Sequence, residues 1–170
     1  MQQSEIPPIK RRMICMIYEA LLIFGVLFIA DLAFEALTQH RNAAALGHLR
    51  QLWLFVILGT YFVFFWRRGG QTLAMKTWRL KLIAPGAAQV SLKQAIYRYI
   101  LSWMWFLPAL ALGYAIPTNN WTRVGLIAAG LIGWAATARW SSDRQFLHDR
   151  WAGTALVNVE KVATSPVAGK

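Results

Sequence analysis

The chain has 170 residues, of which 57% are hydrophobic and nine are Trp, and its formal net charge is +11. The apolar residues gather in runs of 17 or more, which excludes an ordinary soluble domain and indicates a small all-α protein that crosses a membrane several times. The basic residues lie between these runs, so membrane topology and anionic lipid headgroups explain them better than nucleic acid does. Because Cys15 is the only cysteine, an internal disulfide and a cysteine-based metal cluster are excluded.

The first predicted span covers residues 13–37 and follows the basic triplet Lys10 to Arg12. Residues 1–9 contain two adjacent prolines and no apolar periodicity, so we expect a disordered lead-in. A helix of about 20 residues crosses the hydrocarbon core, and this run is 25 residues long. A signal peptide has a shorter apolar region without acidic residues, so we expect the span to stay in the mature protein.

Three further spans are predicted at about residues 49–66, 100–116 and 121–138. Aromatic residues flank the second span, as expected at the two membrane interfaces, and Pro108 should kink the third. In the fourth span small residues recur at every fourth position, which forms a smooth stripe where another helix can approach closely. These small residues are Gly125, Ala129, Gly133 and Thr137.

A small cytoplasmic hairpin is predicted between the second and third spans. Apolar residues alternate there with Arg79 and Lys81, which is typical of a strand with one wet face. Pro85 and Gly86 suit the two central positions of a type II turn. A return strand would then contain Val90 and the residues next to it.

Capping signals predict where the helix of the third span begins. Ser91 and Gln94 have the spacing of a capping box, so a helix should start there and carry Arg98 toward the span. Residues 139–151 are polar and amphipathic, which predicts a C-terminal helix lying on the inner membrane surface. Residues 10–160 then form one transmembrane domain, and the tail at 161–170 should be disordered.

The distribution of positive charge orients the spans. Of the 18 Lys and Arg residues, 15 lie in the N-terminal segment, in residues 67–98 or from residue 139 onward. The opposite side holds Arg41, Arg50 and Arg123. Because cytoplasmic loops carry an excess of Lys and Arg, both termini are predicted to be cytoplasmic.

Three acidic residues lie within the first span, where a charged group is costly. Asp31 and Glu35 approach the outer interface, and we expect them to reach water or Arg41. Glu19 lies deeper, on the same helical face as Arg12 and about 10 Å along the axis from it.

Two interpretations of Glu19 stay open on the sequence. One is a buried structural ion pair with Arg12, Arg98 or Arg150 as the partner. The other is a proton or cation site, because desolvation and nearby charges tune the protonation of an intramembrane acid.

Enzymatic motifs do not emerge from the sequence. The glycines before Thr72 lack the Gly-Lys-Ser/Thr ending of a phosphate loop, so a turn after the second span is the better interpretation. His148 has Asp143 and Asp149 nearby, but no second His stands at helical spacing, which makes a poor metal site. We therefore expect no enzyme, no cofactor and no metal.

Three segments resemble the RDD family of membrane proteins, which is named for one arginine and two aspartates. They are residues 11–19, residues 70–83 and residues 147–157, in the order and spacing typical of the family. On this resemblance Arg12 is the family arginine and Asp149 the second aspartate. Glu19 stands in the place of the first aspartate, with Asp31 as an alternative.

The resemblance implies an integral protein of the bacterial cytoplasmic membrane, of unsettled molecular function, with transport suggested. Our first hypothesis is a small transporter, or a component associated with transport, in which Glu19 handles a proton or cation. Four membrane-spanning helices are too few to enclose a transport path well, so we expect a homo-oligomer to form it. The alternative is a non-transporting module that packs against a membrane partner through the small-residue stripe, with Arg12, Glu19 and Asp149 as a structural network.

Overall fold

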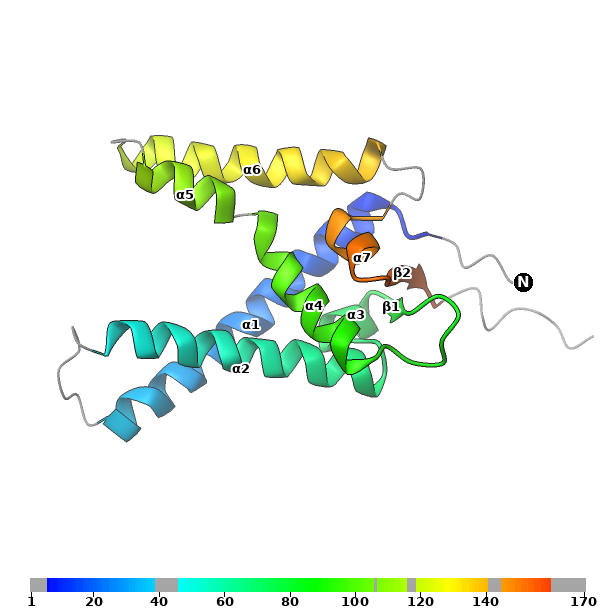
Figure 1. Cartoon of the computed structure of the whole chain (residues 1–170), viewed down its shortest axis with the longest axis horizontal. Coiled ribbons are helices and arrows are strands. Elements are labelled where there is room, and N and C mark those ends of the chain that lie inside the picture. The colour runs from blue at the N-terminus through cyan, green and yellow to red at the C-terminus, as the bar shows by residue number, and fades with distance from the viewer. Residues whose placement is uncertain (1–5, 39–45, 106, 116–118, 141–144, 160–170) are drawn as a thin grey trace, which may run out of the picture. The chain divides into compact units, whose positions relative to one another are not determined.

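The structure is a computed structural model, shown in Figure 1. It describes residues 6–38, 46–105, 107–115, 119–140 and 145–159. The chain is mostly helical and divides into two compact units. One unit comprises residues 1–82 and 157–170, and the other comprises residues 83–156. The predicted tail and most of the predicted lead-in lie outside the described residues.

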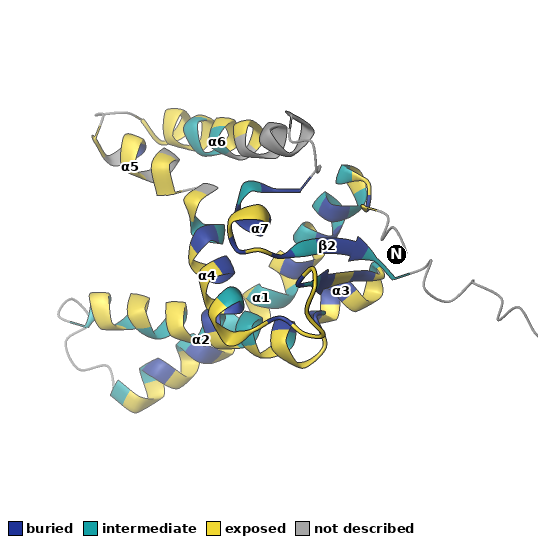
Figure 2. Cartoon of the chain, turned by 45° about the vertical axis from the view of Figure 1, so that its right-hand side comes forward, coloured by how far each residue is buried: buried dark blue, intermediate teal, exposed yellow. Residues whose placement is uncertain are grey.

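Two long helices dominate the first unit. The helices α1 (Ile9–Thr38) and α2 (Gly47–Arg68) pack against each other and run in opposite directions (Figure 1). Both are long and apolar enough to cross a membrane, and only 11% of the residues in the most apolar window of each are buried. Figure 2 accordingly shows long stretches of both helices as exposed. A core helix of a soluble protein would be mostly buried, so these helices agree with the first two predicted spans.

A short helix and two strands follow α2. The helix α3 (Leu73–Thr77) begins at the N-cap residue Thr72, and β1 (Leu80–Ile83) comes directly after it. The partner of β1 is β2 (Ala155–Asn158), from the end of the chain. Within the first unit, the backbone amide of Val159 donates to the carbonyl oxygen of Arg79 over 2.9 Å.

The predicted hairpin is therefore wrong in its second strand. Val90 is buried but is not part of a strand, and Leu92 begins the helix α4 (Leu92–Ser102). The predicted turn itself is present, because Ala87 N donates to Ala84 O over 3.0 Å and Gly86 has a φ of +80°. The prediction of the turn from Pro85 and Gly86 is confirmed, but the strand that pairs with β1 lies far away in the sequence.

The predicted third span is not one continuous helix. The helix α4 starts with the predicted capping box of Ser91 and Gln94 and ends at Ser102. A 3₁₀ turn (Trp103–Trp105) follows, and helix α5 covers Leu107–Ala115. Pro108 lies in the first turn of α5. Backbone N–H groups in a first turn have no acceptor within the helix, so the lack of an N–H in proline breaks no helical hydrogen bond there. The proline therefore marks the start of a helix and not a kink within one.

The helix α6 (Asn120–Trp140) covers the predicted fourth span and packs against α5. A single surface helix over residues 139–151 is not observed. Instead α6 continues to Trp140, and a separate helix α7 (Leu147–Trp151) contains His148 and Asp149, both buried. The polar pattern over residues 139–151 did not indicate where the helix is interrupted or that His148 is buried beside Asp149. That α5 and α6 cross the membrane stays a prediction.

Candidate functional site

Glu19 is the most deeply placed acid of the first helix and is 8% exposed. Two hydroxyl groups donate hydrogen bonds to its carboxylate. The Tyr61 hydroxyl of α2 donates to Oε1 over 2.8 Å, and the Thr72 hydroxyl, at the start of α3, donates to Oε2. The carboxylate is thus held between three consecutive elements of the first unit.

Backbone amides at the start of α3 orient both hydroxyl groups. The first amides of a helix have no partner within the helix and need an acceptor elsewhere. The Met75 amide donates to the Thr72 hydroxyl over 3.3 Å, and the Leu73 amide is hydrogen-bonded to the Tyr61 hydroxyl. Each hydroxyl oxygen is therefore occupied by an amide, which leaves its own proton for Glu19.

The loop between α2 and α3 connects this carboxylate to the strand β1. Gly70 O accepts from Leu82 N over 2.7 Å, and Gln71 Nε2 donates to Leu80 O over 2.6 Å. Gly70 also has a φ of +70°, which a glycine adopts readily. The sequence was interpreted here as a turn only. The structure shows that successive residues of this turn bind β1 and Glu19.

Arg12 is also buried and lies on the same face of α1 as Cys15 and Glu19, as the helical period predicted. Among the first-unit residues that the structure describes, however, no guanidinium lies within ion-pair distance of the Glu19 carboxylate. The carboxylate is satisfied by Tyr61 and Thr72 instead. The sequence offered a signal for Tyr61, because it is a polar-tipped aromatic residue within a span.

A separate ion pair lies in the second unit. Arg98 of α4 pairs with Asp149 of α7, and their side chains are 8% and 1% exposed. His148 Nε2 lies 3.3 Å from the same carboxylate oxygen, Oδ1. Arg150 is exposed on α7. Arg98 thus forms an ion pair with Asp149 of its own unit. A network that joins Asp149 to Arg12 and Glu19 stays a prediction.

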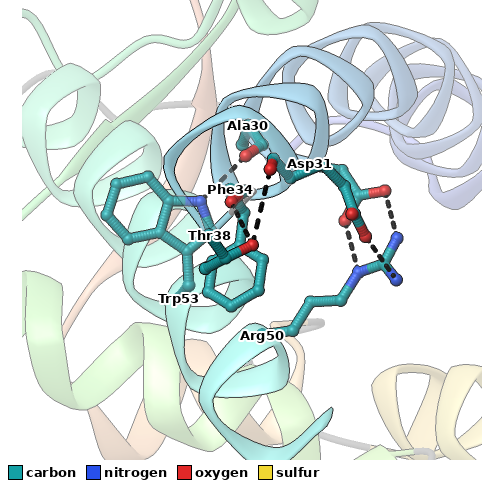
Figure 3. A network of polar contacts seen from close by, with 7 residues as sticks. Ala30, Asp31, Phe34, Thr38, Arg50 and Trp53 are labelled. Atoms are coloured by element: carbon teal, nitrogen blue, oxygen red, sulfur yellow. Dashed lines mark hydrogen bonds and ion pairs between the residues drawn. The ribbon is translucent and has the colours of Figure 1, made fainter. Parts of the chain in front are cut away.

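Asp31 and Glu35 share one arginine, Arg50, near the other end of the two long helices. Figure 3 shows Arg50 beside Asp31. Arg50 Nε donates to Asp31 Oδ1 over 2.6 Å, its Nη2 pairs with Oδ2, and its Nη1 lies 3.3 Å from Glu35 Oε1. The predicted partner, Arg41, lies outside the described residues. Arg50 takes this role because α2 runs back along α1, which places its first turn beside the last turns of α1.

Trp53 adds a second polar contact between the same two helices. Its indole Nε1 donates to the carbonyl oxygen of Ala30 over 2.9 Å, and its ring packs on Phe34 at a centroid distance of 6.4 Å (Figure 3). Tryptophan combines an apolar ring with one donor, which suits this depth near a membrane interface.

The small-residue stripe of α6 stays open in the described part of the chain. Gly125, Ala129 and Gly133 are exposed, and a Cβ added at either glycine would meet no atom within 4 Å. The side chain of Thr137 lies outside the described residues. Elsewhere in the second unit, an added Cβ would lie 3.6 Å from Cγ of Arg123 at Gly113 and 3.5 Å from Nε2 of Gln94 at Gly153.

Metal ligands do not gather in the described residues: no three His, Cys, Asp or Glu side chains come together there. Two apolar helices are long enough to cross a bilayer, and α2 supplies polar partners for acidic residues of α1, which is typical of a membrane protein. The sequence matches the RDD family over residues 6–153, so the chain belongs to the RDD family. This confirms the resemblance of the three sequence segments. Comparison with curated proteins and with solved structures gave no match.

Proposed function

We propose that Glu19 takes up and releases a proton in a small transporter, or transport-associated component, of the bacterial cytoplasmic membrane. The observation that carries the proposal is a buried carboxylate in a membrane-capable helix whose hydrogen-bond donors are two neutral hydroxyl groups. Structural ion pairs keep a buried carboxylate charged, whereas neutral donors permit both protonation states.

Two opposing effects act on the Glu19 carboxyl group. Burial favours its neutral form, and hydrogen bonds from Tyr61 and Thr72 favour its charged form. A displacement of either hydroxyl group changes the balance between the two forms. Intramembrane carboxylic acids of this kind are the groups from which proton relays are built.

Protonation of Glu19 also has a structural consequence for α3. A protonated carboxyl group donates from one of its oxygens, so one of the two hydroxyl groups has to accept there and must turn its own proton elsewhere. The hydroxyl of Thr72 caps α3 through Met75, and Tyr61 is bonded to Leu73. Proton uptake is thereby coupled to the start of α3.

The same geometry favours a proton over a metal cation. A hard cation prefers a shell of six or more oxygen atoms. Glu19, Tyr61 and Thr72 supply two carboxylate oxygens and two hydroxyl oxygens, and both hydroxyl oxygens already accept amide protons. A proton requires only the carboxylate.

The experiment compares reconstituted protein with its Glu19→Gln variant in liposomes under an imposed pH gradient or sodium gradient. Glu35→Gln is the matched control, because it removes an acid of the same type from the same helix. We expect gradient-driven flux that Glu19→Gln abolishes and Glu35→Gln retains, at equal amounts of folded protein. Absence of flux in the unmodified protein, or equal flux in both variants, contradicts the proposal.

Infrared difference spectroscopy provides a second measurement that does not depend on finding a substrate. Between high and low pH, the unmodified protein should show the carbonyl band of a protonated carboxyl group, and Glu19→Gln should lose it. Tyr61→Phe should shift that band, because it removes one of the two donors. An unchanged band in Glu19→Gln would assign the protonation to another acid.

A second candidate function is a module that packs against a membrane partner or another copy of the chain. The open surface over Gly125 and Gly133 favours it, because small residues let helix backbones approach closely. Gly133→Leu should weaken self-association in crosslinking experiments. Gly25→Leu is the control, since Gly25 of α1 is equally open. Equal association of the two variants would show that the small-residue stripe does not mediate self-association.

A further inference from the structure

The helix α7 lies in a short segment whose two ends are joined by a side chain. Gln145 Nε2 donates to the carbonyl oxygen of Leu156 over 3.3 Å, and Gln145 Oε1 accepts from the Leu156 amide over 3.2 Å. Between these ends, Thr154 N donates to the carbonyl oxygen of Asp149 over 2.9 Å. Residues 145–156, which we call the α7 loop, are thus tied together by their own hydrogen bonds.

Two side chains on one face of α4 contact the α7 loop. Gln94 Nε2 donates to the carbonyl oxygen of Gly153 over 3.2 Å, and Arg98, one turn further along α4, pairs with Asp149. The contact of Gln94 is exposed and joins two neutral groups, so it contributes little. The ion pair is buried, and separating its members inside the protein would leave an uncompensated charge. The packing of the α7 loop on α4 therefore depends most on Asp149.

His148 lies at the same carboxylate oxygen as Arg98. Its Nε2 atom is 3.3 Å from Asp149 Oδ1, and its side chain is 10% exposed. The ring of Phe146 stacks on the imidazole ring with a centroid distance of 5.8 Å and an interplanar angle of 10°. A proton on Nε2 suits a carboxylate oxygen at this distance, because two lone pairs would repel each other. A further proton on His148 would then bind at Nδ1.

Proton uptake at Nδ1 changes the charge of this buried group of side chains. With a neutral imidazole, Arg98 and Asp149 compensate each other and the three side chains carry no net charge. An imidazolium places a second cation beside the guanidinium, and both cations then share one carboxylate oxygen. Because a buried charge without full compensation is costly, the closed arrangement favours the neutral imidazole.

The other titratable groups near this site have smaller effects in the described part of the second unit. Lys93 of α4 and Arg150 of α7 are exposed, so water and salt screen their charges. Tyr97 and Tyr99 of α4 ordinarily titrate near pH 10 and are neutral at the pH values where histidine titrates. Asp143 and Arg144 precede the α7 loop and lie outside the described residues.

We propose that His148 is a second proton-binding site, and that proton uptake there releases the α7 loop from α4 at mildly acidic pH. The site is separate from Glu19, which lies in the first unit. Histidine is the side chain that ordinarily changes charge between pH 5 and 8. Once α7 leaves α4, the imidazolium is hydrated and no longer adjoins Arg98, so the open arrangement binds the proton more tightly. Proton uptake therefore shifts the loop toward the open arrangement.

Hydrogen–deuterium exchange of the reconstituted full chain measures this opening. The amides of Ala152 and Thr154 report it, because they donate to carbonyl oxygens within the α7 loop and a five-residue helix is not stable without its packing. An open form that titrates at about pH 6.5, with a closed form that stays unprotonated, raises the opening constant about tenfold between pH 7.5 and pH 5.5. We expect about tenfold faster exchange at pH 5.5, after correction for the intrinsic pH dependence of exchange.

His148→Gln retains an N–H donor for Asp149 but does not titrate, so its corrected exchange should be the same at both pH values. His48→Gln is the matched control, because it removes a histidine of α2 in the first unit and should keep the tenfold response. A response that persists in His148→Gln would assign the titration to another group and overturn the proposal. Corrected exchange of the unmodified protein that does not depend on pH would overturn it as well.

Arg98→Gln provides a second test, in which the direction of the response reverses. Without the guanidinium, the imidazolium is the sole cation beside the buried Asp149 carboxylate, so protonation of His148 should stabilise the closed loop. Corrected exchange in Arg98→Gln should then be slower at pH 5.5 than at pH 7.5, at equal amounts of folded protein. Faster exchange at pH 5.5 in this variant would contradict the assignment to His148, because a role in packing alone cannot reverse the sign.

Discussion

Replacement of Gly70 by alanine should be among the most damaging small substitutions in the chain. The φ of Gly70 is +70°, and an alanine Cβ would lie 2.4 Å from the carbonyl oxygen of Leu82. The left-handed conformation costs a residue with a Cβ about 1–2 kcal/mol. Forcing a methyl group into occupied space typically costs about 1–3 kcal/mol more. We therefore expect Gly70→Ala to lower the free energy of unfolding by about 2–5 kcal/mol.

Two other glycines separate these contributions. Gly86 has a φ of +80° but open space around the added Cβ, so Gly86→Ala should cost only the conformational part, about 1–2 kcal/mol. Gly69 has open space and a φ of −151°, so Gly69→Ala should be nearly neutral. Denaturant titration of the three variants in the same micelles gives the ranking. If Gly70→Ala and Gly86→Ala lose equal stability, the close approach of β1 to the α2–α3 loop is refuted.

Two further substitutions test the polar contacts of each unit. Arg98→Met leaves the Asp149 carboxylate buried without its partner and should cost about 3–5 kcal/mol, measured by denaturant titration; a loss below 1 kcal/mol would mean that the pair is not formed. Trp53→Phe removes the hydrogen bond to the Ala30 carbonyl and should cost about 0.5–1.5 kcal/mol. No loss of stability on that change would show that Trp53 contributes only its ring.

The features that depend on local chemistry were predictable from the sequence. Hydrophobic length located α1 and α2, the Ser91 and Gln94 spacing located the start of α4, and Pro85 with Gly86 located a turn. Each of these signals rests on residues within one element or one turn of each other. The helical period likewise placed Arg12 and Glu19 on one face of α1.

The features that depend on distant residues were not predictable in the same way. Strand β1 has an ordinary alternating pattern that fits any partner, so the pattern could not select β2 over residues near Val90. The hydroxyl donors of Glu19 are separated from it by 42 and 53 positions in the chain. Charge alone suggested a guanidinium as the partner of a buried acid, because hydroxyl groups leave no charge signal in a sequence.

The pairing of β1 with β2 can form only late in the synthesis of the chain, because β2 lies near the end of the sequence. Strand β2 begins about 75 residues after β1, and ribosomes add about 5–20 residues per second. The first two helices are therefore available for insertion roughly 4–15 s before β1 can meet its partner. During that interval one edge of β1 lacks its native partner at the end of the Gly70 loop, open to mispairing or to recognition by proteases. A chain cut short before β2 would therefore leave that edge of β1 without its native partner.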